Sequence, residues 1–203
     1  TEPKFAAGDH FDYSNSGYAL LGLIVEVVGK KPFDQFLRDE IFNPLGMNNT
    51  VMYVRGMNTV ANRAYGHEKK GDQWIRADQS VTSAVRGDGG IYSSLDDLKK
   101  WLRALDDRKL LSKASYEAIF SPRTKTDRGD ACYGFGWFID EHRGELRISH
   151  EGDTRGFNTA VQRYPNRRGA VVVLINSQVE GGLRDVATRI ADTVVMGKQS
   201  ANR

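Results

Sequence analysis

The chain is poor in cysteine and has no long apolar run. Cys132 is the only cysteine among 203 residues, so no disulfide can form within the chain. A lone thiol does not decide the compartment, because many exported proteins lack disulfides. No segment approaches the roughly 20 apolar residues that a membrane-spanning helix needs. The longest candidate, residues 18–28, is short and is interrupted by Glu26. We therefore expect no membrane span.

Neither charge nor histidine is clustered. The formal net charge is +3, and lysine and arginine are dispersed along the chain. Without a basic run we expect no nucleic-acid partner. The histidines stand far apart in the sequence, which does not suit a metal set, and we expect neither a metal nor a cofactor. With 39% hydrophobic residues the composition is that of an ordinary globular domain with one sizeable core. The histidines are His10, His67, His142 and His150.

The first 130 residues combine helical patterns with loops. A polar cluster from Tyr13 to Gly17 precedes an amphipathic stretch, and hydroxyls in that cluster can cap its helix. A long excursion at 55–88 has poor periodicity, so we interpret it as a loop that lines a functional surface. The pattern predicts helices at 18–29, 33–42, 95–105 and 113–120, and a short strand at 50–54.

The last third of the chain changes to strand patterns. Residues 170–175 are apolar on both faces, which predicts a central, covered strand. An amphipathic stretch at 183–195 predicts a closing helix able to cover the sheet. Helices followed by an antiparallel meander and a helix indicate the α+β class. The other predicted strands are 133–139, 146–150 and 157–164, with turns at 141–144 and 165–169.

Two short stretches carry candidate chemistry. Tyr13 and Asn15 lie two residues apart, so an extended segment points both side chains the same way. A phenol and an amide together supply proton transfer and hydrogen bonding. His150 precedes Gly152 near the end of a predicted strand, where a glycine permits close approach of a ligand. The N–H of Asp153 is then a candidate oxyanion donor.

These stretches resemble motifs of one superfamily. Tyr13-Ser14-Asn15 is similar to the Tyr-x-Asn element of serine β-lactamases and penicillin-binding proteins, and His150-Glu151-Gly152 is similar to the His-x-Gly variant of their Lys-Thr-Gly element. Within that superfamily, class C β-lactamase-like esterases and D-Ala-D-Ala carboxypeptidase-like peptidases are the nearest groups. Supporting segments are 89–94, 133–137 and Gly156-Phe157. The resemblance implies a β-lactamase/transpeptidase-like fold, with an antiparallel sheet flanked by helices and a helical subdomain.

The resemblance also implies roles. Tyr13 is expected to shuttle a proton between nucleophile and leaving group. Asn15 is expected to bind the substrate carbonyl or amide and to orient a catalytic lysine. His150 stands where many relatives have lysine, so carboxylate-bearing β-lactams are disfavoured relative to esters and peptides. Gly152 completes the element, and Asp153 supplies one oxyanion N–H.

One departure is serious. The superfamily's nucleophile lies on a Ser-x-x-Lys helix, and no serine in this chain has lysine three positions later. The chain also opens on Thr1 without methionine, as if cut from something longer. We expect a partial domain, residues 1–203, whose first strands and nucleophile lie upstream. Its residues 1–130 are expected to be mainly helix and loop, and 131–203 to hold the sheet and the last helix.

Such a chain is expected to be inactive alone. It should pair through its unpaired sheet edge with the upstream segment or with a second copy. The expected substrate is a small molecule or a peptide. A catalytically inactive binding or scaffold protein is the alternative. The compartment stays open between an exported bacterial location and the cytoplasm.

Ordinary structural explanations stand beside the functional ones. Tyr13 alone suggests core packing, Asn15 alone a helix cap, and His150 alone a hydrogen-bonded strand residue. Ser14 lacks a base placed by the sequence, so we expect a cap or loop residue. Other conspicuous residues are expected to be structural: Asp96 and Asp97 as helix-start acids, Trp101 and Trp137 in the core, and Cys132 as an inert thiol.

Overall fold

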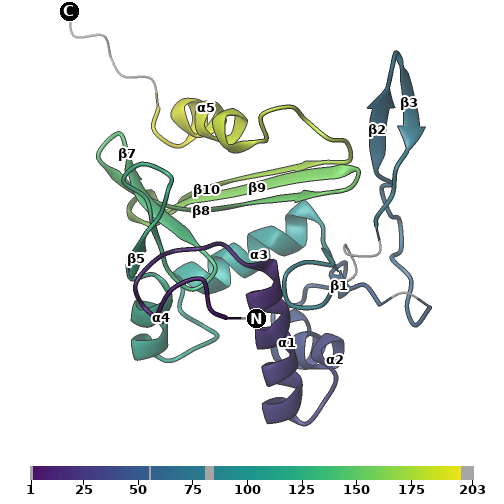
Figure 1. The fold of residues 1–203 in the computed structure, drawn as a ribbon. Helices are drawn as coiled ribbons and strands as arrows, with labels where there is room; N and C mark the ends of the chain where they lie inside the picture. Colours follow the sequence, from purple (N-terminus) through teal and green to yellow (C-terminus); the bar gives the residue numbers. More distant parts are fainter. Residues whose placement is uncertain (1, 55, 81–84, 198–203) are drawn as a thin grey trace, which may run out of the picture.

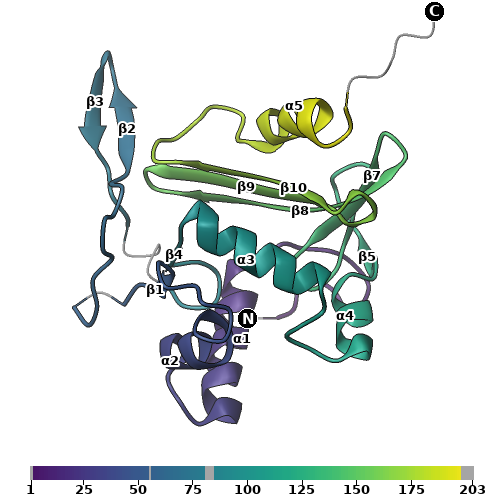
Figure 2. The ribbon, with the colours of Figure 1, turned by 180° about the vertical axis from the view of Figure 1, so that it is seen from behind.

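The structure is a computed structural model that describes residues 2–54, 56–80 and 85–197. It is α+β: α5 lies on one face of an antiparallel sheet, α3 and α4 lie on the other side, and α1 and α2 lie farthest from α5 (Figures 1 and 2). The helices are α1 (Asn15–Gly29), α2 (Phe33–Leu37), α3 (Leu95–Asp106), α4 (Lys113–Ile119) and α5 (Arg184–Val194), with a π-helical turn at Arg38–Phe42 and a 3₁₀ turn at Pro165–Arg167.

Ten strands complete the described part of the chain. They are β1 (Val51–Met52), β2 (His67–Lys70), β3 (Gln73–Arg76), β4 (Ile91–Tyr92), β5 (Thr124–Lys125), β6 (Cys132–Tyr133), β7 (Phe138–His142), β8 (Glu145–Thr154), β9 (Phe157–Tyr164) and β10 (Gly169–Ile175). The main sheet has the order β10-β9-β8-β7-β6-β5, while β1 pairs with β4 and β2 with β3. The β2–β3 hairpin stands beside the body of the molecule (Figure 1).

The register of β8 shapes the site. Its pairing with β9 runs to its last residue, Thr154 opposite Phe157. Its pairing with β7 ends at Ser149, opposite Phe138. Residues 150–154 of β8 therefore extend beyond β7 at the end of the sheet that faces the start of α1.

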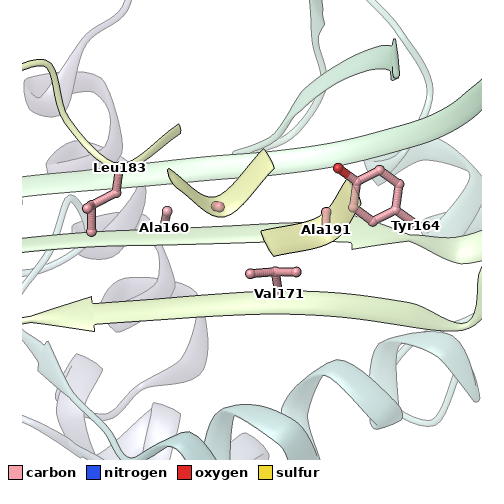
Figure 3. Close-up of a cluster of buried hydrophobic side chains, with 6 residues drawn as sticks. Ala160, Tyr164, Val171, Leu183 and Ala191 are labelled. Atoms are coloured by element: carbon pink, nitrogen blue, oxygen red, sulfur yellow. The ribbon is translucent and has the colours of Figure 1, made fainter. Parts of the chain in front are cut away.

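Three hydrophobic clusters make the core. The cluster in Figure 3 joins Val171 of β10 and Tyr164 of β9 to Ala187 and Ala191 on α5. A second cluster, on the opposite side, includes Tyr116, Trp137 and Ile148. Trp137 stacks on Trp101 with ring centroids 5.7 Å apart, which confirms the predicted core position of these indoles. The third gathers Leu37, Phe42, Met47 and Met52 around α2 and β1.

The predicted elements are largely present, with corrections. The predicted helix at 33–42 is α2 followed by a π-helical turn, and the predicted strand 133–139 is two strands, β6 and β7. The backbone turns between them, where Gly134 N–H donates to Trp137 C=O at 2.8 Å and Gly136 has a φ of +79°. The excursion at 55–88 contains the β2–β3 hairpin, and its residues 55 and 81–84 lie outside the described residues.

The predicted central position of 170–175 is wrong. In the described sheet β10 pairs only with β9 and is the outermost strand. Only one of its faces packs against α5, where Val171 is buried, while Leu174 is 40% exposed. A run that is apolar on both faces does not itself reveal which neighbour covers the second face.

Candidate active site

The start of α1 is fixed by a serine cap. Ser14 is extended, and its Oγ accepts a hydrogen bond from Gly17 N–H at 3.0 Å. This satisfies one of the unpaired N–H groups at the helix start. The predicted role of Ser14 as a cap is confirmed. The cap holds Tyr13, the preceding residue, at the base of a fifteen-residue helix.

Tyr13 and His150 lie together across a cavity. Their ring centroids are 5.9 Å apart, although 137 residues separate them in the sequence. The cavity has a volume of about 170 Å³. It is lined by Tyr13, Tyr18, Gly87, Asp88, Tyr133, Gly136 and His150. A phenol–imidazole crevice of this kind can pass a proton to or from a bound group.

Two hydrogen bonds and burial together determine the protonation state of the His150 imidazole. Its Nδ1 lies 2.6 Å from the Glu151 carbonyl oxygen, and its Nε2 lies 3.1 Å from the Tyr133 hydroxyl. Burial lowers the pKa of His150 below its usual value, because a buried imidazolium loses hydration. The imidazole is therefore neutral at neutral pH.

Tyr13 remains a protonated phenol at neutral pH. Tyr13 is 45% exposed, yet partial burial raises its pKa, and the nearby Tyr18 and Asp88 raise that pKa further. Each of these effects disfavours the phenolate. The nearby Arg128 lowers the pKa but does not offset them, so Tyr13 needs a further neighbouring cation to act as a base.

The other predicted site residues lie apart from this cavity. Asn15 is exposed in the first turn of α1 and is not among the residues that line either described cavity. Gly152 and Asp153 line a second cavity of about 360 Å³, together with Arg128 and Glu151. Gly152 packs tightly against β9, since a Cβ there would lie 2.5 Å from the Thr159 hydroxyl. A side chain at position 152 would therefore force the Thr159 hydroxyl to move.

Five lining residues were not predicted as site residues from the sequence: Tyr18, Gly87, Asp88, Tyr133 and Gly136. Tyr18 lies one turn into the helix whose start carries Tyr13. Tyr133 is opposite Phe138, which is opposite Ser149, so strand register brings Tyr133 beside His150. Register between β6, β7 and β8 was the missing information, and the glycine-aromatic pattern at 133–137 was the only hint.

The residues that the structure describes contain neither a cluster of metal-binding side chains nor a helix suited to a membrane. No group of three or more His, Cys, Asp or Glu side chains there could hold a metal ion. Within the same residues, no helix combines the length and the apolar character that crossing a bilayer requires.

Comparison with known proteins gives consistent matches. The family model described as "Beta-lactamase" matches residues 1–195. Penicillin-binding protein 4* of Bacillus subtilis is 29% identical over 96% of this chain and 46% of its own length. A D-aminopeptidase of Brucella canis is 27% identical over 94% of this chain and 36% of its own length.

A solved structure shares the fold. The octameric penicillin-binding protein homologue from Pyrococcus abyssi superposes with a TM-score of 0.84 at 26% identity, over 94% of this chain and 44% of its own. The chain thus spans less than half the length of each of these three proteins.

Proposed function

Because the chain belongs to the β-lactamase family, we propose that it forms part of a serine hydrolase. The proposed reaction cleaves an ester, amide or β-lactam bond through an acyl-enzyme. The nucleophile is a serine of a Ser-x-x-Lys segment outside these 203 residues, in which no serine has lysine three positions later. The observation that carries the proposal is the meeting of Tyr13 and His150 across one cavity.

Tyr13 is the proposed proton carrier. Its pKa is raised, so at neutral pH it carries the proton that a leaving group must receive. Taking the proton from the nucleophile requires that a cation stabilise the phenolate, and the lysine of Ser-x-x-Lys supplies that charge. The Asp153 N–H and the N–H of the nucleophile are the proposed oxyanion donors. Asn15 is proposed to reach the substrate once the nucleophile segment is in place.

The neutral state of His150 affects which class of substrate the site is expected to prefer. An uncharged imidazole attracts a carboxylate less than a lysine ammonium does. We therefore propose esters and peptide amides as preferred substrates over carboxylate-bearing β-lactams. The D-aminopeptidase name of one relative is consistent with an amide substrate.

The nucleophile segment is the proposed partner of two open surfaces. One face of α1 exposes apolar side chains, including Val27 at 77% and Val28 at 75%. Within the described sheet, β10 has a neighbour on one side only. Proteins normally cover such edges and patches. A segment that packs on α1 and pairs with β10 covers both and places its serine near Tyr13.

The test uses the protein extended upstream to include a Ser-x-x-Lys segment. Hydrolysis of a p-nitrophenyl ester and of a chromogenic β-lactam is measured, and a fluorophosphonate probe followed by mass spectrometry identifies the labelled serine. We expect ester turnover and labelling of the Ser-x-x-Lys serine.

Tyr13→Phe tests the role of the phenol in the same extended protein. It should lower kcat/KM by about 10²- to 10⁴-fold, as loss of a proton-transfer group does. Tyr65→Phe is the matched control, because Tyr65 is 42% exposed and is not among the residues lining the cavity. A Tyr13→Phe enzyme as active as wild type would overturn the role of Tyr13.

The absence of Ser-x-x-Lys from these residues also supports a second candidate, a binding or scaffold protein that keeps the fold without the chemistry. Absence of both turnover and labelling in the extended protein would favour that candidate. Labelling of a serine within residues 1–203 would exclude it and would also move the nucleophile into this chain.

A further inference from the structure

We propose that Tyr133 is a positioning residue of this site, which donates its hydroxyl proton to His150 Nε2 and so holds the imidazole neutral in one tautomer. The inference deepens the proposed function and rests on it for its catalytic meaning. Tyr133 belongs to β6 and lines the same cavity as Tyr13 and His150.

The direction of each hydrogen bond follows from chemistry. A carbonyl oxygen can only accept, so the 2.6 Å contact from His150 Nδ1 to the Glu151 carbonyl requires a proton on Nδ1. In a neutral imidazole with Nδ1–H, Nε2 carries the lone pair. The Tyr133 hydroxyl at 3.1 Å must then donate to Nε2. Backbone and phenol together select one tautomer.

The remaining surroundings of His150 favour the same state. The rings of Phe138 and Tyr13 pack at centroid distances of 5.6 Å and 5.9 Å, which removes water from the imidazole. Two charged groups face it, and they act in opposite directions: Glu151 favours the imidazolium and Arg128 disfavours it. These two side chains form an ion pair at 2.6 Å, so their fields partly cancel at His150. Burial lowers the pKa of His150 more than the hydrogen bond to the Glu151 carbonyl raises it, and the Tyr133 hydroxyl adds to the effect of burial.

Tyr133 has a further neighbour on its other side. Tyr18 lines the same cavity, and burial together with the nearby Tyr18 raises the pKa of Tyr133. The phenol therefore keeps its proton and remains a donor at neutral pH. Tyr18, Tyr133 and His150 all line the cavity that Tyr13 also lines.

Removing the Tyr133 hydroxyl should make His150 easier to protonate. Donation to the Nε2 lone pair stabilises only the neutral form, because a protonated Nε2 has no lone pair. Tyr133→Phe keeps the ring, which packs edge-on against Phe138 at 4.8 Å. We expect the pKa of His150 to rise by about half to one unit, the shift that loss of one neutral hydrogen bond produces.

The experiment is a titration of the ¹⁵N-histidine-labelled chain by NMR. Long-range ¹H–¹⁵N spectra should show Nδ1 protonated and Nε2 unprotonated in the wild type. Tyr133→Phe should raise the pKa of His150 while His10, His67 and His142 titrate as before. Tyr65→Phe, a Tyr→Phe change outside the cavity, should leave all four histidines unchanged.

Two results would overturn the proposal. One is a wild-type His150 with the proton on Nε2, which requires no variant and so does not depend on how Tyr133→Phe folds. The other is a fall in the pKa of His150 in Tyr133→Phe, which would mean that Tyr133 accepts a hydrogen bond from an imidazolium.

The titration needs no nucleophile, so it separates this inference from the proposed function. If the NMR results hold and the extended protein is not labelled by fluorophosphonate, Tyr133 positions His150 in a non-catalytic site. If labelling succeeds, Tyr133→Phe in the extended enzyme should move the acidic limb of the kcat/KM profile to higher pH. A uniform loss of kcat with an unmoved limb would indicate a merely structural role.

Discussion

Two adjacent aspartates at the start of α3 have opposite environments. Asp96 is exposed, whereas Asp97 is fully buried. Asp97 accepts hydrogen bonds from Asn49 N–H at 2.7 Å, from Thr50 Oγ1 at 2.9 Å and from Lys100 Nζ at 2.8 Å. Asp97 is therefore more than a helix-start acid, because it ties α3 to the segment before β1.

Asp97→Asn should destabilise the chain by about 2 kcal/mol, because an amide cannot replace both acceptor oxygens and leaves a buried donor unsatisfied. Asp96→Asn, the matched control on the same turn, should change the free energy of unfolding by less than about 0.5 kcal/mol. Urea denaturation measures both. Equal effects of the two variants would show that the buried network contributes nothing.

The stability difference should depend on pH. Burial alone raises the pKa of Asp97, but the hydrogen bonds from Lys100, Asn49 and Thr50 outweigh it and hold the pKa below the ordinary value of 3.8. A lowered folded-state pKa stabilises the protein above the unfolded value. The gap between wild type and Asp97→Asn should therefore persist at neutral pH and shrink as pH falls below about 4.

At the scale of elements, hydrophobic periodicity predicted helices well where one side of the helix is apolar. Three of the long helices were predicted close to their bounds, because α1 has a capping serine, α3 has another, and α5 has an amphipathic stripe. Position within the sheet was not predictable from such patterns. The apolar run of β10 looked doubly covered, yet its place at the edge depends on which other strands are present.

The site was also predictable only in part, because local patterns do not specify which elements become neighbours. Short motifs pointed to Tyr13 and His150, and the fold brings these two rings together. Tyr133 and Asp88 join them through strand register and through a loop before β4, and neither the register nor the course of the loop can be read from a local pattern. Asn15 shares the motif with Tyr13 but lies on the exposed side of the helix start. Motif membership therefore did not by itself predict orientation.

The contribution of the Ser14 cap to the stability of α1 can be tested by substitution. Ser14→Ala removes the acceptor of Gly17 N–H and should cost about 1 kcal/mol of stability, with faster amide exchange in the first turn. Ser16→Ala is the control, since Ser16 is exposed within the helix and alanine is favoured there. If both variants exchange at the wild-type rate, the cap does not hold the segment that carries Tyr13.

At the scale of the whole molecule, the apolar surface is unevenly distributed. Six large apolar side chains of α1 are at least half exposed and fall within one contiguous arc of the helix. They are Leu20, Leu21, Leu23, Ile24, Val27 and Val28. Monomeric proteins rarely leave such an apolar patch exposed. In the described sheet the outer edge of β10 also lacks a neighbouring strand, and such an edge can pair with another chain.

The chain on its own should therefore associate in solution. Light scattering at about micromolar concentration should give a mass above the 22.7 kDa of one chain. Val27→Lys should shift the distribution toward the monomer, because association would bury an unpaired ammonium. Met57→Lys is the control, since Met57 is equally exposed, at 76%, but lies outside α1.

In the extended protein the same Val27→Lys change should instead lower thermal stability, because the nucleophile segment would cover that face. Two results together would show that the apolar face of α1 has no partner: a monomeric mass for the chain alone, and an unchanged thermal stability of the extended protein with Val27→Lys.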